Sequence, residues 1–172
     1  MNLECLMKSL ERFSRILPAA VSELDSEVAT WKPAPEHWSI LEVVCHLADE
    51  EVHDFRPRVR LTIESPGTAW PPFDPQQLAI DGRYNEQNLQ DALERFLQER
   101  NDSLKWLRSL NRVDWDQSFE HSLMGPTPAG RIMAAWAAHD WLHLRQISKR
   151  FFEMVERDGE PYDVHYAGKW TA

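Results

Sequence analysis

Two histidines one helical turn apart are the strongest chemical signal in the chain. His139 and His143 are separated by three residues in the segment HDWLH. At this spacing two side chains leave the same face of a helix, and their imidazoles can converge on one metal ion at about 2.0–2.1 Å. Ile132, Trp136 and Ile147 continue the same helical row, which places both histidines on the buried face. A metal site is therefore predicted, with satisfied core histidines as the alternative.

A third imidazole comes from a different segment. His46 lies beside the apolar positions Val43 and Leu47 of an earlier helical pattern, so it also points inward. Three imidazoles suit zinc, nickel, cobalt, copper or iron, and zinc or nickel is the expected ion. Because three protein ligands leave coordination positions open, the pattern favours a catalytic site over a purely structural one.

Acidic residues and a further histidine come after His46. Glu50 and His53 lie one and two turns beyond it, and either could be a fourth ligand, a partner of a ligand or a general base. Asp49 and Glu50 are the candidate proton acceptors. A solvated acidic patch formed by Asp49, Glu50 and Glu51 is the alternative. A fourth protein ligand would favour a structural metal site instead.

Two familiar metal motifs fit the sequence poorly. The zincin motif HExxH uses its glutamate as a general base, but Asp140 stands at that position and no clear third ligand comes after it. A ferritin-like di-iron site needs Glu-x-x-His on two helices. Glu50 and His53 supply one such pair, and the last helical segment supplies none.

The elements that must position these residues are helices. Apolar residues spaced by three and four predict four of them, over residues 3–30, 40–64, 85–110 and 128–156. Pro18 should kink or break the first helix. Ser39 and Glu42 form a capping box that should start the second. Thr127 and Pro128 look like an N-cap and the first residue of the fourth.

Each predicted helix carries one apolar stripe, and four such helices bury their stripes against one another in an all-α four-helix bundle. The 172 residues suggest a single domain, with residues 158–172 as an irregular tail. The connections over residues 65–84 and 111–126 are long, so a crossover topology is open. Residues 117–124 could form a short strand. The aromatic loop from Trp70 to Phe73 could cover the mouth of the site or simply pack as a rigid loop.

The amino-acid composition limits the classes of partner that the protein could bind. A net charge of −9 argues against binding to nucleic acid or to an anionic membrane. The expected partner is a small-molecule substrate. No leader sequence and no apolar run long enough to span a bilayer is visible, so we expect a soluble, cytoplasmic protein. Cys5 and Cys45 are expected to be buried free thiols in a reducing compartment, with a disulfide as the alternative.

Around the three histidines the chain resembles the DinB-like superfamily, which includes the YfiT-type metal hydrolases and thiol-dependent S-transferases. The segment WSILEVVCHLAD, from Trp38 through His46, is similar to the family's W-[ST]…H-[IL]-x-[DE] pattern. The segment from His139 to Ile147 is similar to its H-x-x-x-H-x-x-[QH]-[IL] pattern, about 90 residues later. The resemblance implies a four-helix bundle of unusual connectivity, a metal ion on the same three histidines and, in many members, a homodimer.

The resemblance also suggests two chemistries. Family members of established activity use the metal to activate a low-molecular-weight thiol such as mycothiol, bacillithiol or glutathione, which predicts an S-transferase. In a hydrolase the open position would hold water, with Glu50 or Asp49 as the proton acceptor. The alternatives to a metal-dependent enzyme are a non-catalytic metal-binding or stress-associated bundle, and an interaction module with vestigial histidines.

Overall fold

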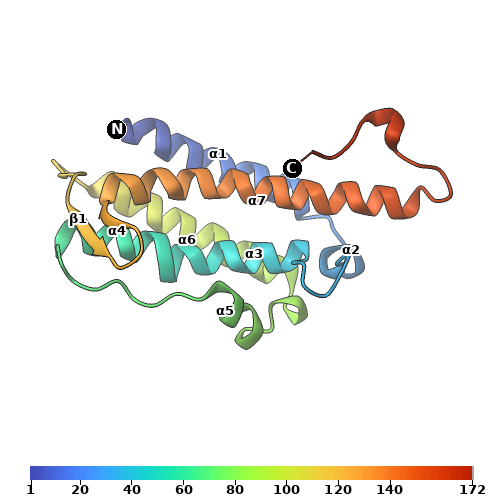
Figure 1. Ribbon diagram of the computed structural model, residues 1–172, viewed down its shortest axis with the longest axis horizontal. Coiled ribbons are helices and arrows are strands. Elements are labelled where there is room, and N and C mark those ends of the chain that lie inside the picture. The colour runs from blue at the N-terminus through green and yellow to red at the C-terminus, as the bar shows by residue number, and fades with distance from the viewer. Residues whose placement is uncertain (172) are drawn as a thin grey trace.

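Four long helical segments form the body of the molecule, as Figure 1 shows for the computed structural model, which describes residues 1–171. The second segment is composite, because a π-helical turn joins two α-helices. The segments are α1 (Leu3–Val21), α3 (Ile40–Asp49) continued by η1 (Glu50–Asp54) and α4 (Phe55–Glu64), α6 (Leu89–Ser109) and α7 (Ala129–Asp158). The predicted four-helix bundle is confirmed.

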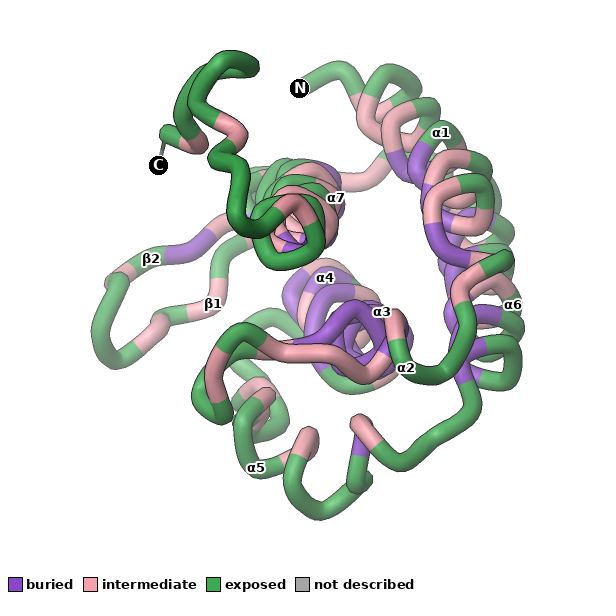
Figure 2. Tube along the Cα trace, turned by 90° about the vertical axis from the view of Figure 1, so that its right-hand side faces the viewer, coloured by how far each residue is buried: buried purple, intermediate pink, exposed green. Residues whose placement is uncertain are grey.

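The bundle has a crossover topology. Helix α1 packs against α6 and α7, while α3 packs against α6 and α4 against α7. In Figure 1, α1 and α7 run in one direction and the α3–α4 segment and α6 run in the other. The long connection after α4 therefore returns along the bundle before α6 begins. Figure 2 looks along the bundle and shows buried positions on the sides of α1, α3 and α6 that face one another.

Shorter elements fill the connections: α2 (Ser26–Thr30), α5 (Pro75–Asp81), η2 (Tyr84–Glu86), β1 (Ser118–His121), β2 (Gly125–Pro128) and η3 (His165–Ala167). The two strands form an antiparallel hairpin in which Phe119 lies opposite Thr127. The predicted extended stretch at residues 117–124 is thus confirmed for residues 118–121, while residues 122–124 form the turn of the hairpin. The tail after α7 folds back beside that helix, and the one helical element in its described residues is the short 3-10 helix η3.

The predicted capping box is present and fixes the start of α3. The Glu42 N–H donates to Ser39 Oγ at 3.1 Å, and the Ser39 N–H donates to Glu42 Oε2 at 2.8 Å. Every residue of α3 is buried. Because the cap sets where the helix begins, it also sets the direction in which His46 projects.

Two predicted helix boundaries are wrong. The first helix passes through Pro18 and ends at Val21, and the chain then turns before α2. The Asp25 side chain accepts from the Val28 N–H at 2.9 Å and so starts a separate helix. The third helix begins at Leu89, where the Asn88 side chain caps it.

The predicted cap of the last helix is also wrong. Thr127 and Pro128 belong to strand β2, and α7 begins at Ala129. Pro128 occupies the N-cap position and offers no side-chain hydrogen bond, while the Thr127 hydroxyl donates to the Gly125 carbonyl at 3.0 Å. The helix start is tied instead to the preceding loop, because the Gly130 N–H donates to the Trp115 carbonyl at 3.0 Å.

The π turn was not anticipated by the helical pattern. Within η1 the Phe55 N–H donates to the carbonyl of Glu50, five residues earlier. Such a turn adds a residue to the helix and rotates the residues after it, and it occurs often at functional sites. Asp49, Glu50 and Glu51 are 7%, 6% and 0% exposed, so the expectation of a solvated acidic patch is wrong.

The cysteines differ in their environments. Both are free thiols, but Cys5 is exposed and only Cys45 is buried. Cys5 lies outside the buried stripe of α1, which consists of Leu10, Phe13, Leu17 and Val21. The prediction of buried thiols therefore holds for Cys45 alone. Among residues 1–171 no helix has the length and apolar character needed to cross a membrane.

Candidate metal centre

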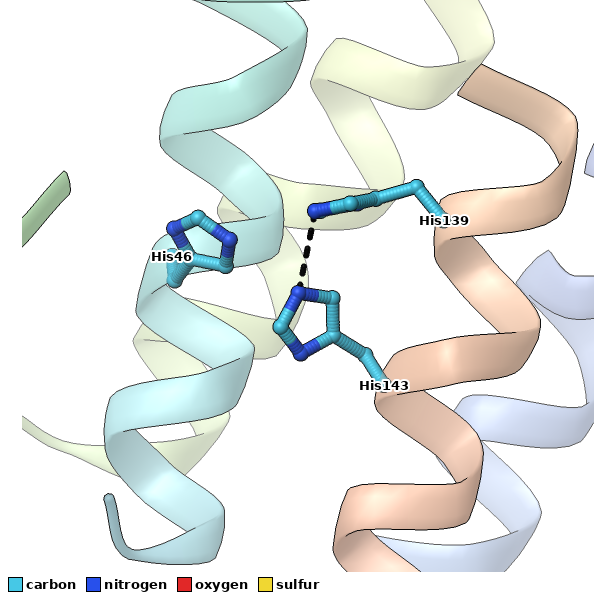
Figure 3. A group of neighbouring side chains, drawn as sticks. All are labelled: His46, His139 and His143. Atoms are coloured by element: carbon cyan, nitrogen blue, oxygen red, sulfur yellow. Dashed lines mark hydrogen bonds between the residues drawn. The ribbon is translucent and has the colours of Figure 1, made fainter. Parts of the chain in front are cut away.

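The structure brings the three predicted histidines together. His46 comes from α3, and His139 and His143 come from α7, as Figure 3 shows. One ring nitrogen from each residue lies within 4.8 Å of the other two. The Nε2 atoms of His139 and His143 are 3.0 Å apart. Three nitrogens this close can share a single ion.

All three imidazoles are held in the neutral form that binds metals. Burial lowers the pKa of His46 to about 2, with further lowering by the imidazoles of His143 and His139. Burial, together with the neighbouring His143, lowers the pKa of His139 to about 3. The pKa of His143 is also lowered, chiefly by burial. Lone pairs are therefore available at neutral pH.

The ring of His143 is oriented by the residue one turn further along α7. Its Nδ1 atom lies 2.8 Å from Gln146 Oε1. A carboxamide oxygen only accepts, so Nδ1 carries the proton and Nε2 presents its lone pair to His139. His46 Nδ1 is buried and has no hydrogen-bond partner within the described chain. A divalent transition-metal ion fits this set of converging, incompletely satisfied nitrogens.

Glu50 is the carboxylate at the cluster. Its Oε1 atom lies 3.2 Å from His46 Nε2 and 4.0 Å from His139 Nε2. Burial raises its pKa, and the neighbouring Asp54 carboxylate raises it further. Arg58 pairs with Asp54 at 2.5 Å and opposes that rise. A carboxylate with a high proton affinity therefore stands beside the histidine nitrogens.

Asp49 and His53 are not brought to the cluster. Asp49 accepts from the Tyr84 hydroxyl and from Arg95 Nη1, the latter at 2.8 Å, so its carboxylate faces α6 and η2. His53 is exposed and lines a different pocket beside α5. Of the candidate general bases and fourth ligands, only Glu50 adjoins the three histidines.

The comparisons with known proteins agree with the geometry. A sequence profile described as the DinB superfamily matches residues 9–147, well over half of the chain. The chain belongs to the DinB superfamily. The matched residues include both histidine motifs and most of the helical body between them.

Two curated relatives of this DinB-superfamily chain come from Oceanobacillus iheyensis, and each carries the name "Putative metal-dependent hydrolase". One is 27% identical over 143 residues, which cover 83% of this chain and 81% of the relative. The other is 29% identical over 144 residues, with coverages of 82% and 80%.

A solved structure shows the same fold. It is described as "YfiT from Bacillus subtilis is a probable metal-dependent hydrolase with an unusual four-helix bundle topology". The TM-score is 0.78, and the match covers 88% of this chain and 87% of the other, at 18% identity. The crossover bundle of this chain is therefore a fold already seen in an experimental structure.

A buried ionic network lies behind the histidines of this DinB-superfamily chain. Both oxygens of Asp140 accept from the Arg100 guanidinium, at 2.7 and 2.8 Å. Arg100 Nε and Trp136 Nε1 both donate to Glu51 Oε1, at 3.0 and 2.7 Å. Asp140 is thus fully engaged away from the cluster and cannot replace the zincin base. The network joins α6 to η1 and α7 next to His139.

The cluster opens into a pocket of about 360 Å³. The ring of Trp38 stands 4.7 Å from that of His46 and forms part of the wall. The lining residues are Glu36, His37, Trp38, His46, Glu50, Pro75, Gln76, His139, His143, Gln146 and Arg150.

The aromatic loop does not cover this pocket, contrary to one of the two expectations. Trp70 stacks on Phe119 at 4.4 Å and donates to Thr62 Oγ1 at 3.1 Å, so it packs against α4 and the hairpin. Pro75 and Gln76 of α5 contribute to the wall instead. The alternative of a packed loop therefore holds for Trp70, whereas Pro71 and Pro72 are exposed.

Proposed function

We propose that this chain is a metal-dependent hydrolase that holds one divalent ion, zinc or nickel, on His46, His139 and His143, with Glu50 as its general base. The observation that carries the proposal is the convergence of three neutral imidazoles on one point, with the Glu50 carboxyl 3.2 Å from His46 Nε2. The names of the two Oceanobacillus relatives and of YfiT support the same reaction class. The substrate is a small molecule that enters the 360 Å³ pocket.

The ion would supply Lewis acidity and lower the pKa of water in the open position. The protein's own residues prepare the site. Gln146 fixes the tautomer of His143, and Trp38 shields one side of His46 from solvent. Glu50 Oε1 takes the proton of the attacking nucleophile. The high proton affinity that burial and Asp54 give to Glu50 makes its ionised form an effective base.

The test uses protein stripped of metal and then reloaded with zinc or nickel. Ester and amide substrates are assayed in parallel with conjugation of glutathione, bacillithiol or mycothiol to an electrophile. We expect hydrolysis only in the reloaded protein. Thiol conjugation without hydrolysis would assign the site to an S-transferase and overturn the hydrolase proposal, as would equal hydrolysis by the stripped protein.

Glu50→Gln separates the base from the ligands. We expect it to retain metal and to lower kcat by about 10²–10⁴-fold, the usual contribution of a general base. Glu94→Gln is the matched control, because Glu94 is exposed on α6. A Glu50→Gln protein that loses its metal would make Glu50 a ligand rather than the base, and one with unchanged kcat would exclude both roles.

A further inference from the structure

A second pocket adjoins the histidine pocket along α7. It has a volume of about 420 Å³ and lies between α7, the segment before α3 and the C-terminal tail. It shares His37, Gln146 and Arg150 with the histidine pocket. Trp170 of the tail forms its outer wall and packs on Phe152, with ring centroids 5.4 Å apart. The two pockets are thus neighbouring compartments of one cleft.

The charge of this second pocket is opposite to that of the chain. Arg145, Lys149 and Arg150 line it, and no carboxylate does so among the residues that the structure describes. The protein as a whole carries a net charge of −9. A concentration of three cations in a concave wall creates a local positive potential that attracts anionic ligands.

Of these three cations, Arg150 is the one whose buried guanidinium lacks hydrogen-bond partners in the described part of the chain. It is only 3% exposed, yet its Nε and Nη1 atoms have no hydrogen-bond partner in residues 1–171. The nearest acid is Glu153, whose Oε2 lies 3.0 Å from Nη1 without hydrogen-bond geometry. Glu153 also lies 3.8 Å from Lys149, so it is shared between two cations.

A buried guanidinium without hydrogen bonds is costly, and native structures rarely leave one unsatisfied. The planar fork of arginine matches the two oxygens of a carboxylate or phosphate. Arg150 lines both compartments, so a ligand that occupies the histidine pocket can reach it. Two acidic residues, Glu36 and Glu50, also line the histidine pocket.

We propose that Arg150 binds an oxyanion of the ligand, and that the substrate class of this site is a small molecule with a terminal carboxylate or phosphate. Arg150 lies seven residues after His143 on α7, which corresponds to about 10 Å along the helix. In such a ligand, several covalent bonds would therefore separate the anionic group at Arg150 from the group held at the histidines. The substrate assignment rests on the proposed function, whereas oxyanion binding by Arg150 does not require it.

Binding is tested with glutarate and with inorganic phosphate as probes, on both metal-free and metal-loaded protein. Isothermal titration calorimetry compares wild type with Arg150→Gln, Arg150→Lys and the control Arg131→Gln, since Arg131 is exposed on α7 and lines neither pocket. We expect Arg150→Gln to weaken binding of at least one probe by tenfold or more, Arg150→Lys to weaken it less, and Arg131→Gln to leave it unchanged. A preference for one probe identifies the oxyanion as carboxylate or phosphate.

Thermal unfolding distinguishes a binding role from a structural one. Arg150→Gln removes the 3.0 Å ion pair with Glu153, and removing one partner of a buried pair is destabilising, so its melting temperature should fall in the absence of anions. The increase in melting temperature that each probe produces is therefore compared, and we expect it to be smaller in Arg150→Gln than in wild type. Equal affinity of wild type and Arg150→Gln, no binding of either probe, or an equal increase in the melting temperature of the two proteins with both probes would overturn the proposal.

The hydrolase assay makes failure of this inference distinguishable from failure of the proposed function. For a pair of esters that differ only in a terminal carboxylate and its methyl ester, we expect wild type to prefer the carboxylate and Arg150→Gln to lose the preference. Equal kcat/KM values for the pair in wild type would contradict the anion subsite while leaving the hydrolase intact. Calorimetry on metal-free protein tests the subsite even if no ester is hydrolysed.

Discussion

Gln146 Oε1 accepts a hydrogen bond from His143 Nδ1 over 2.8 Å, and this contact decides which nitrogen of His143 faces the cluster. Partners of this kind orient metal-binding histidines and raise their basicity. Gln146 stands one turn beyond His143 on the same helix, so the two side chains are neighbours on one face of α7. The ligand set therefore depends on a residue that does not itself adjoin the other two histidines.

Gln146→Ala should weaken metal binding by about 10–100-fold, because His143 loses the acceptor that fixes its tautomer. Competition with a chromophoric chelator measures the affinity. Gln98→Ala is the matched control, since Gln98 is exposed on α6 and its side chain donates to Asp102 Oδ2 at 3.0 Å, away from the histidines. Unchanged affinity in Gln146→Ala would show that the contact does not orient a ligand.

The network around Arg100 should make a large contribution to the stability of the fold. Arg100→Met leaves the carboxylates of Glu51 and Asp140 buried without their cation, and breaking a buried pair typically costs about 3–5 kcal/mol. Urea denaturation of metal-free protein gives the free energy of unfolding. Arg108→Ala, which removes an exposed ion pair with Glu11, should cost no more than about 1 kcal/mol. Similar losses for the two variants would contradict this account of the network.

The two thiols should differ in reactivity. Burial raises the pKa of Cys45 to about 12, so this thiol stays protonated and unreactive at pH 8 and still at pH 9. Cys5 is exposed. Labelling with iodoacetamide, read by mass spectrometry, should modify one thiol per chain in native protein and both in denaturant. Rapid native labelling of Cys45 at pH 8, or a labelling rate at that residue that levels off between pH 8 and 9, would show that its environment is not as described.

Much of the fold could be predicted because helical periodicity is a strong local signal. The apolar stripes specified four helices, and the Ser39–Glu42 capping box correctly placed the start of α3. Helix boundaries that depend on side-chain contacts were harder to predict from the sequence. Asp25 ends the first helical pattern by starting a new helix, and pairing with Phe119 draws Thr127 into a strand. Such contacts depend on the tertiary structure and leave no periodic trace.

The cluster of His46, His139 and His143 could be predicted from two motifs, but the carboxylates around it could not. An ideal α-helix places Asp49 and Glu50 only about 100° apart, which left both as candidates. In the structure a π turn follows Asp49, and the sequence shows no signal for it. Asp49 faces α6 and η2, whereas Glu50 faces the histidines. Arg150 was missed although it continues the inward row two turns after His143, and a charged residue on that row was a signal that could have found it.

The most direct test of the central claim is the metal content of protein purified without a polyhistidine tag. Inductively coupled plasma mass spectrometry is applied to wild type, His46→Ala, His143→Ala and the control His53→Ala, whose imidazole is exposed outside the cluster. We predict about one zinc or nickel ion per chain in wild type and in His53→Ala, and a loss of most of it in the other two. Stoichiometric metal that persists in His46→Ala and His143→Ala, or wild-type protein that binds neither ion when both are supplied, would contradict the three-histidine site.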